Sequence, residues 1–596
     1  MTQTRPLISV IVPFRDNEDD LADCLDSIAA QTYRELDVIM VDDGSVDGGS
    51  AIAEARAARD ARFRLLRLTD GGSPGYARNR GLELATGEFL AFADGDDLVP
   101  ANAYELMVHT LERSGSDLVS GQADRLGPKG VNPSMMHALA IKGRQTGTHI
   151  SRTPRLLYDA TVWNTMFRRS FWDKNKLSFP EGMVFEDIQL MTMAYVLAGK
   201  ADVIPDVVYV WRERVQGGGS ITQRRGDVAN LRDRVAALAN IDEFLAAQGQ
   251  RKLRRAHQRK ALKNDLWLYV GELHKVTPAY RAEFGALVGD YLAHADRRVL
   301  RSLPATHKLA YYLVRRGALD QLAQYAAWLM DQPVRQAPLI RYHGRLVADL
   351  PFLRTGLPSG RIPRRMYRPH WRDLDPYMQV DDVQWQGDQL VVAGRANVPS
   401  IDVSRRRNTS KVVMLRPPGR RLPRLVRVRS FEHPEATALS EQDRYNYDWS
   451  GFRFAVRPEA AAFRQPGTWQ AYMLVRGRSV WRPARVHTPV PGRAEHPAPR
   501  DVAPGLRFGA RWAGLGLNLA TWRTTAVLRT VAPIRPALPA LPALPAPAST
   551  PPSDDARRLH APTARASVTA PTICARGPGL TTLWSVGEQQ NDGARA

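Results

Sequence analysis

The nine residues FLAFADGDD, at positions 89–97, decide how the fold is read. The apolar run Phe89–Ala93 is typical of a short buried strand, and acidic residues follow it directly. Asp94 and Asp96 are separated by one residue, so their carboxylates can converge on one Mg²⁺ or Mn²⁺ ion, which prefers oxygen ligands. Acidic pairs are common in surface loops, and it is the apolar run before this pair that favours a metal site.

Apolar runs and helical patterns alternate in the sequence around this stretch. The expected strands are 7–12, 36–41, 63–68 and 88–93, and the expected helices are 19–31, 50–59 and 76–85. This alternation predicts an α/β fold with a mostly parallel sheet covered by helices on both faces. In such sheets, ligands bind beyond the carboxyl ends of the strands, which is where the acidic residues fall.

Three further short motifs lie in the first 220 residues. Val41–Ser45 (VDDGS) and Phe185–Asp187 (FED) place more carboxylates at what we expect to be strand ends. Gly71–Gly75 (GGSPG) precedes a helix that contains Arg78, and a flexible backbone at a helix start can approach a phosphate. Arg78 adds a fixed positive charge there. Each of these motifs, taken alone, is also compatible with an ordinary turn.

The chain divides into regions of different pattern. We expect an α/β domain at 1–225, a helical region at 226–345 and a Pro- and Arg-rich connector at 346–375. Period-two alternation between turn residues at 376–490 predicts a small all-β, sandwich-like domain. Residues 491–596 contain proline-rich repeats and little periodicity, which predicts a linker and a disordered tail.

Composition narrows the class of protein. The chain has 596 residues and is 44% hydrophobic, which suggests several folded domains and excludes a wholly disordered or collagen-like protein. Its two cysteines exclude a cysteine-based zinc site and a disulfide framework. The start lacks the pattern of a secretory signal, and no stretch reaches the ~20 apolar residues of a membrane helix. We therefore expect a cytoplasmic location, with 506–531 as the candidate for contact with the inner face of the plasma membrane.

The net charge of +22 is unevenly distributed. Residues 1–220 carry a net charge of −7, and the rest of the chain carries +29. A basic region of this size suits an anionic polymer, an anionic membrane surface or nucleic acid. It is equally compatible with the Arg-rich codon usage of a GC-rich genome. No zinc finger, basic zipper or RNA-binding aromatic signature is present, so we expect no specific nucleic-acid partner.

Taken together, the motifs are similar to those of the family 2 glycosyltransferases, which have a GT-A fold. The segments that carry the resemblance, in order, are IVPFRDNEDDLADCLDSIAAQTYRELDVIMVDDGS at 11–45, GYARNRGLELATGEFLAFADGDD at 75–97, FPEGMVFEDIQL at 179–190 and YVWRERVQGGGSIT at 209–222. The resemblance covers about residues 6–225. The order of glycosyltransferase, helical and β regions resembles bacterial wall teichoic acid and surface polysaccharide glycosyltransferases.

This resemblance implies an inverting, metal-dependent transfer of a sugar from a nucleotide-diphosphate donor, expected to be a UDP-sugar, to an acceptor hydroxyl. The implied catalytic residues are Asp187, as general base, and Glu186, which orients the base or the acceptor. The implied donor-binding residues are Pro13, Arg15, Asp43, Arg78, Asp94, Arg212 and Arg214, and the implied ligands of Mg²⁺ or Mn²⁺ are Asp96 and Asp94. Arg15 and Asp16 stand where family members often have an aromatic residue and Asn.

Three functions remain open at this point. The leading one is a glycosyltransferase whose partners are a nucleotide-sugar donor and an anionic or saccharide polymer of the bacterial cell surface. The alternative is a catalytically degenerate carbohydrate-binding protein, against which Asp94, Asp96 and Asp187 argue. The third is sequence-blind nucleic-acid binding through the basic half, which charge alone can give. The sequence leaves the oligomeric state open.

Overall fold

The computed structural model describes the chain in several stretches. They are residues 5–69, 71–128, 130–213, 224–332, 337–416, 422–440, 445–458, 467–485, 500–503, 506–513 and 516–523. The described residues up to Asp373 form one compact unit, and those from Leu374 onward form a second. The expected disordered tail lies outside the described residues beyond position 523.

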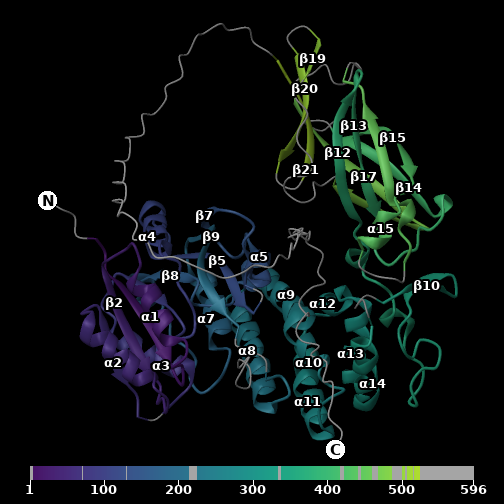
Figure 1. Cartoon of the computed structure of the whole chain (residues 1–596). Coiled ribbons are helices and arrows are strands. Elements are labelled where there is room, and N and C mark those ends of the chain that lie inside the picture. The colour runs from purple at the N-terminus through teal and green to yellow at the C-terminus, as the bar shows by residue number, and fades with distance from the viewer. Residues whose placement is uncertain are drawn as a thin grey trace, which may run out of the picture. The chain divides into compact units, whose positions relative to one another are not determined.

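A mixed sheet runs through the first unit (Figure 1). Over the described residues its strand order is β3-β2-β1-β4-β8-β5-β9-β7, with β6 paired to β5. The strands are β1 Ile8–Phe14, β2 Leu36–Asp42, β3 Phe63–Arg67, β4 Phe89–Phe92, β5 Leu118–Gly127, β6 Gly130–Pro133, β7 Gln145–Thr148, β8 Thr165–Arg168 and β9 Ala201–Arg212. β1 pairs in parallel with β2 and β4, and β2 with β3, whereas β8 runs antiparallel to β4 and β5. The expected α/β fold is confirmed, but the sheet is mixed, where the alternation predicted a mostly parallel one.

Helices cover both faces of this sheet. They are α1 Leu21–Ala29, α2 Gly49–Arg59, α3 Pro74–Leu84, α4 Ala103–Ser114, α5 Met135–Ala140, α6 Arg169–Lys174 and α7 Glu186–Leu197. Successive side chains of a strand point to opposite faces, so β1 packs with two sets of helices. Val10 and Val12 share a buried cluster with residues of α1 and α4, whereas Ile11 shares one with residues of α3 and α7.

Helices also dominate the rest of the first unit. They are α8 Val228–Ala247, α9 Arg251–Lys260, α10 Trp267–Val270, α11 Pro278–His294, α12 Arg297–Ser302, α13 Ala305–Arg315 and α14 Leu319–Met330. The region expected to be helical ends instead in a hairpin of β10 Leu339–Tyr342 and β11 Arg345–Ala348. His343 and Gly344 both have positive φ, which is the backbone conformation that a tight two-residue hairpin turn requires.

The second unit is built from antiparallel strands, as expected from the period-two pattern. Over the described residues their order is β12-β13-β16-β15-β14-β17-β21-β20-β19, with β18 paired to β17. The strands are β12 Tyr377–Gln386, β13 Gln389–Asn397, β14 Thr409–Arg416, β15 Arg424–Phe431, β16 Gly451–Val456, β17 Gly467–Gly477, β18 Val480–Arg485, β19 Arg500–Ala503, β20 Leu506–Ala513 and β21 Gly516–Arg523. A short helix, α15 Glu435–Ala438, follows β15.

The strands β19 to β21 differ from the expectation of a linker beginning at residue 491. β21 pairs with β17, and β20 pairs with β21 along the whole of both strands. The sequence LRFGARWA at 506–513 alternates large apolar residues with arginine and small residues, which is a strand pattern. The described part of the stretch expected to touch a membrane surface is therefore strand, in β20 and β21.

No helix in the described part of the chain is long and apolar enough to cross a bilayer.

Gly87 offers a test of how tightly the start of β4 packs against β1. A Cβ on Gly87 would lie 2.5 Å from the Ser9 backbone nitrogen and 2.7 Å from the Leu7 carbonyl oxygen. We expect Gly87→Ala to lower the free energy of unfolding by about 1–3 kcal/mol, because backbone atoms must move to make room. Urea unfolding would measure this. Gly226→Ala is the control, since its Cβ would only touch Val276 at 4.0 Å, and equal midpoints for the two variants would contradict the packing.

Candidate functional site

The carboxyl ends of β1, β2 and β4 meet at one edge of the sheet. The Asp43 backbone N–H donates to the Phe14 carbonyl at 3.0 Å, and the Gly95 N–H donates to the Pro13 carbonyl at 3.3 Å. A Cβ on Gly95 would come within 2.8 Å of Phe14, so the loop after β4 crosses closely over the end of β1. Pro13, Asp43 and the acidic loop 94–97 therefore lie side by side at this edge.

Arg78 joins this edge to the FED motif. Its guanidinium donates to Asp94 Oδ1 at 2.6 Å and also to Glu186 Oε1, and it lies over the ring of Phe179. The side chains of Arg78 and Glu186 are only 6% and 7% exposed. Their burial alone would lower the pKa of Arg78, but Asp94 and Glu186 outweigh it and raise that pKa above its usual value. The sequence motifs predicted each of these residues, and the structure brings them together.

Glu186 and Asp187 lie in the first turn of α7 and not at a strand end, so that part of the sequence interpretation is wrong. Phe185, just before the helix, has a left-handed backbone conformation with φ 72°. It is held by α8, because the Arg234 guanidinium lies 3.6 Å from the centre of its ring. A Cβ on Gly75 would lie 2.4 Å from the Pro180 carbonyl oxygen, so only glycine allows the start of α3 to approach the backbone of Pro180 so closely.

Asp187 titrates near neutral pH. Burial, as the largest cause, and the neighbouring charge of Glu186 raise its pKa to about 7, against the opposing effect of Arg78 and Arg234. Its Oδ1 accepts a hydrogen bond from the backbone N–H of Ile188 at 2.8 Å. A carboxylate whose pKa lies near the working pH can both accept a proton and release it, which is what general base catalysis requires.

Two residues that the sequence did not single out hold the acidic loop in place. Asp97 is 1% exposed, and its carboxylate accepts hydrogen bonds from the Tyr209 hydroxyl at 2.8 Å and the Arg212 backbone N–H at 2.7 Å. The Tyr209 hydroxyl also accepts from the Asp94 backbone N–H at 2.9 Å. Burial raises the pKa of Asp97 well above its usual value, and Asp96 and Asp94 add to this. The DGDD motif contains Asp97, but nothing in the sequence pointed to Tyr209, which lies 112 residues away.

Three other residues predicted to bind the donor, Asp43, Arg15 and Arg212, differ in their burial and contacts. Asp43 is buried, and its Oδ1 accepts from the Gly72 backbone N–H at 2.7 Å, which ties the loop after β2 to the glycine-rich loop. Arg15 is exposed, and its guanidinium lies against Gly71. Arg212 is paired with Asp20 at 2.9 Å and Asp23 at 3.0 Å, so its guanidinium is directed to α1. Arg214 lies outside the described residues.

The described residues contain no group of three or more His, Cys, Asp or Glu side chains arranged to hold a metal ion. Mg²⁺ and Mn²⁺ sites that also bind a diphosphate need only one or two carboxylates, because phosphate and water oxygens complete the coordination. Asp94 and Asp96 fit that requirement. Burial is the main cause of the raised pKa of Asp97, and the smaller contributions of Asp96 and Asp94 show that these two carboxylates lie close to it.

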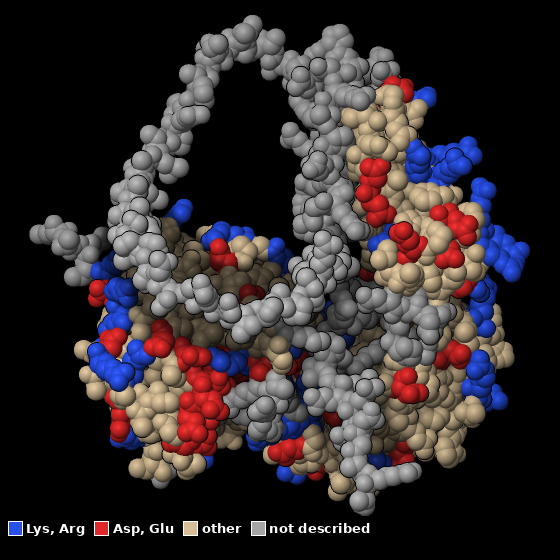
Figure 2. Space-filling model, in the orientation of Figure 1, with Lys and Arg blue, Asp and Glu red and all other residues tan. Residues whose placement is uncertain are grey.

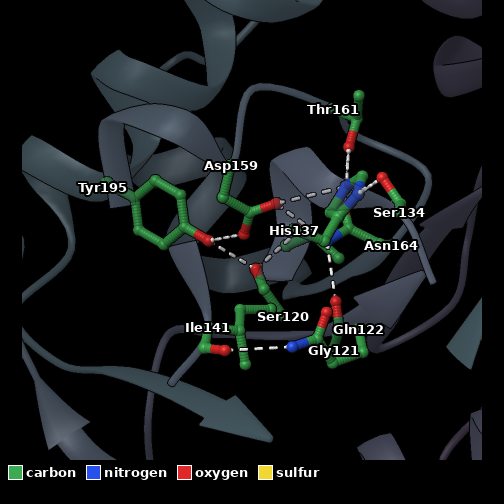
Figure 3. A network of polar contacts seen from close by, with 11 residues as sticks. Ser120, Gly121, Gln122, Ser134, His137, Ile141, Asp159, Thr161, Asn164 and Tyr195 are labelled. Atoms are coloured by element: carbon green, nitrogen blue, oxygen red, sulfur yellow. Dashed lines mark hydrogen bonds and ion pairs between the residues drawn. The ribbon is translucent and has the colours of Figure 1, made fainter. Parts of the chain in front are cut away.

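A buried polar network is centred on Asp159 and His137 (Figure 3). Asp159 accepts hydrogen bonds from Asn164 at 2.8 Å and from the Tyr195 hydroxyl, and its Oδ1 lies 3.7 Å from His137 Nε2. Burial raises the pKa of Asp159 to about 6 and lowers that of His137 to about 4. His137 is therefore neutral at pH 7, and its two ring nitrogens contact the hydroxyls of Ser134 and Thr161.

Trp163 connects this network to the acidic loop. Its ring stacks on Tyr209 with centroids 4.2 Å apart and contacts the His137 ring at 5.1 Å. The network thereby holds the ring whose hydroxyl bonds Asp97 and Asp94.

Residues 9–174 match the model of a family described as Glycosyl transferase family 2. The chain is 30% identical over 218 residues to the uncharacterized glycosyltransferase EpsJ of Bacillus subtilis, in an alignment that covers 35% of this chain and 61% of that protein. It is 28% identical over 214 residues to the poly(ribitol-phosphate) beta-N-acetylglucosaminyltransferase TarS of Staphylococcus aureus, covering 35% of this chain and 36% of that protein. The chain thus matches about three fifths of the first relative's length and about a third of the second's.

The crystal structure of S. aureus TarS resembles the fold over a longer range. The TM-score is 0.51 at 17% sequence identity, and the match covers 87% of this chain and 86% of that chain. This likeness supports the fold alone, and it agrees with the GT-A sheet, the helical region and the antiparallel strands that the sequence predicted.

Removing Arg78 tests whether it compensates the buried charge of Glu186. We expect Arg78→Met to cost about 3–5 kcal/mol of stability, since a buried carboxylate loses its partner. Arg78→Met/Glu186→Gln should recover much of this loss, which thermal unfolding of both variants would measure. Arg80→Met is the matched control on the same helix, because its pair with Glu83 is exposed and should contribute less than about 1 kcal/mol. A double variant no more stable than Arg78→Met would contradict the assignment.

Proposed function

We propose that this chain is an inverting, metal-dependent glycosyltransferase that moves a sugar from a nucleotide-diphosphate donor, expected to be a UDP-sugar, to a hydroxyl of a bacterial cell-surface polymer. The premise is that residues 9–174 match the model of the family 2 glycosyltransferases, as the motifs predicted. The observation that carries the proposal is the convergence of Asp94, Arg78, Glu186 and Asp187 at the carboxyl edge of the sheet.

Donor binding follows from the arrangement of the three strand ends. Pro13, Arg15 and Asp43 are proposed to contact the nucleoside, with Asp43 fixing the glycine-rich loop through Gly72. Asp94 and Asp96 would hold Mg²⁺ or Mn²⁺, which stabilises charge on a departing diphosphate when bound. Arg78 holds the Asp94 carboxylate in place. Arg212 would have to leave Asp20 and Asp23 to reach a diphosphate, so its proposed contact with the donor requires a rearrangement.

Asp187 is proposed to remove the acceptor proton. Inversion requires the acceptor hydroxyl to attack the sugar from the side opposite the departing diphosphate, so one base beside the acceptor is sufficient. Burial and the negative charge of Glu186 keep the Asp187 pKa high, and Arg78 fixes the position of Glu186. Asp187 is therefore basic enough at neutral pH to accept a proton, while a carboxylate with an ordinary pKa would be a much weaker base.

The acceptor is proposed to be a polymer that carries negative charge. The +29 charge of the chain beyond residue 220 supports this, because it suits a polyanion. The poly(ribitol-phosphate) transferase among the relatives acts, by its name, on such a polymer. A catalytically degenerate carbohydrate-binding protein is less well supported, because such a protein would have no need of a buried carboxylate with a pKa near 7.

The fall of the transfer rate at acid pH, the acid limb of the pH profile, tests whether Asp187 is the general base. Because the base must be deprotonated, transfer should rise about tenfold per pH unit below pH 7 and level off above it. Asp187→Asn should lower kcat by at least about 10²-fold. Glu186→Gln removes the neighbouring negative charge and should move the limb to lower pH. Initial rates from pH 5 to pH 9 would measure these effects, with exposed Asp173→Asn as control. A wild-type profile that is flat from pH 5 to pH 7 would exclude Asp187 as the base.

A panel of UDP-, GDP- and CDP-linked sugars tests the donor and the metal. We expect one donor to be hydrolysed slowly in Mn²⁺ or Mg²⁺, with release of the nucleoside diphosphate, and EDTA to stop the reaction. Asp96→Asn should raise the metal concentration for half-maximal rate by about tenfold or more, because one of two carboxylate ligands is lost. Undiminished turnover in EDTA would contradict the metal site. Binding of no donor at all, measured by calorimetry, would favour the degenerate alternative.

A further inference from the structure

A cleft opens in the second unit where β14 and β15 part. The two strands pair from Val412–Arg427 to Leu415–Arg424. Beyond that point, residues 409–411 of β14 pair with β17, and residues 428–431 of β15 pair with β16. The cleft between them has a volume of about 960 Å³ and is lined by both strands and by β16. It lies entirely within the second unit, in a separate part of the fold from the candidate active site.

The cleft is strongly basic. Six arginines and one lysine are among the described residues that line it, and none of these lining residues is acidic. Figure 2 shows Lys and Arg side chains gathered along the border of the second unit that carries β14 and β15. Arg427 and Arg429 are exposed, and no described acidic side chain forms an ion pair with either of them. Their positive charge is therefore available to an anion.

This concentration of charge is unfavourable for the fold by itself. Arg429 on β15 is directly opposite Arg453 on β16 in the antiparallel register. Like charges in directly opposed positions destabilise a sheet. Arg453 and Arg476 are anchored, Arg453 to Gln386 and Arg476 to Ser410 and to backbone carbonyls of 407 and 478. The protein thus holds cations together where pairing with acidic residues would have been more stable.

Lys411 lies at the base of the cleft and fixes its shape. It is 5% exposed, and its ammonium donates to Thr409 Oγ1 at 3.3 Å and to the carbonyls of Trp449 at 3.0 Å and Gly451 at 3.3 Å. These hydrogen bonds connect β14 to the start of β16 on the stretch where β15 no longer pairs with β14. Because burial lowers the pKa of Lys411 to about 7 and its Nζ is bonded to protein oxygens, Lys411 shapes the cleft, and the exposed arginines remain as the groups that contact a ligand.

We infer that this cleft is a binding site, separate from the active site, for a phosphodiester-linked polymer. The inference rests on the proposed function, since the same polymer would be the acceptor. Arginine guanidiniums recognise phosphate oxygens with paired hydrogen bonds. Arg427 and Arg429 are two residues apart on one strand, so they lie roughly 7 Å apart along it and can contact successive phosphates of an extended chain. The volume is near the upper end of the ~300–1,000 Å³ of ligand sites, which favours several repeat units over a single phosphate ion.

The choice of polymer over nucleic acid follows from the lining. Proteins that bind single-stranded nucleic acid without sequence preference provide exposed aromatic rings on which bases stack. Phe454 is the aromatic residue among those that line the cleft, and it is 2% exposed and packed in the core. The cleft therefore offers charge without a stacking surface, which suits a chain of alternating phosphates and polyols.

The test uses the full-length protein and a synthetic glycerol phosphate oligomer as probe. Arg427→Gln/Arg429→Gln removes two cleft arginines. Arg416→Gln/Arg424→Gln is the matched control, because these exposed arginines lie on the same two strands outside the cleft. We expect the cleft variant to raise the Kd for the oligomer by at least about tenfold and to reduce the slope of log K against log salt by roughly two, with the control near wild type. Its unfolding midpoint should be unchanged or higher, since a like-charge contact is relieved.

Acceptor-independent donor hydrolysis separates this inference from the proposed function. If the cleft variant hydrolyses the donor at the wild-type rate and has a raised KM for the oligomer with kcat unchanged, both stand. If donor hydrolysis is normal and both double variants bind the oligomer equally, the cleft site is wrong while the transferase stands. If wild type hydrolyses no donor, the proposed function fails whatever the oligomer result. A single-stranded oligonucleotide bound more tightly than the oligomer, and lost in the cleft variant, would replace the polymer with nucleic acid.

Discussion

The buried guanidinium of Arg78 is the constraint on which the candidate active site depends. It is one cation between two carboxylates from distant parts of the chain, Asp94 after β4 and Glu186 at the start of α7. Without it, those two segments would repel each other in a setting that water screens poorly. Arg78 comes from α3, whose first turn can approach α7 because Gly75 has no side chain. The position of α3, the glycine at position 75 and the ion pairs of Arg78 therefore depend on one another.

The same charge balance bears on the raised pKa of Asp187. Arg78 already forms ion pairs with Asp94 and Glu186. Its positive charge therefore lowers the pKa of Asp187 by less than burial raises it. On the other side of the site, burial raises the pKa of Asp97 well above its usual value, and its carboxyl group accepts hydrogen bonds from Tyr209 and the Arg212 backbone. One acidic residue is thereby used to hold the loop, and Asp94 and Asp96 are the residues proposed to face a cation. The stacked ring of Trp163 then fixes Tyr209 from behind.

Features that depend on neighbouring residues could be predicted from the sequence, whereas contacts between residues far apart in the chain could not. The strands and helices of residues 7–93 follow from local periodicity, and the acidic residues follow from their place after apolar runs. The partnership of Arg78 with Glu186 spans 108 residues, and no local pattern encodes it. The FED motif was misplaced at a strand end, because an apolar residue before two acids suggests a strand unless the left-handed conformation of Phe185 is known. Arg212 was predicted to face the donor, and only the three-dimensional structure reveals Asp20 and Asp23 beside it.

The proposed active site and the proposed cleft site give a physical reason for the uneven charge of the chain. An acidic strand edge attracts a divalent cation and, through it, the diphosphate of a donor, but it repels a polyanion. A polymer with a phosphate in every repeat would therefore gain little affinity from the active site itself, where only one hydroxyl has to enter. Binding its phosphates at the basic cleft of the second unit would supply that affinity from groups that take no part in the reaction. A site that holds the polymer elsewhere raises the local concentration of its hydroxyls without requiring the catalytic carboxylates to be neutralised. Separating the acidic and basic functions into different units of one chain allows each to keep the charge that its ligand requires.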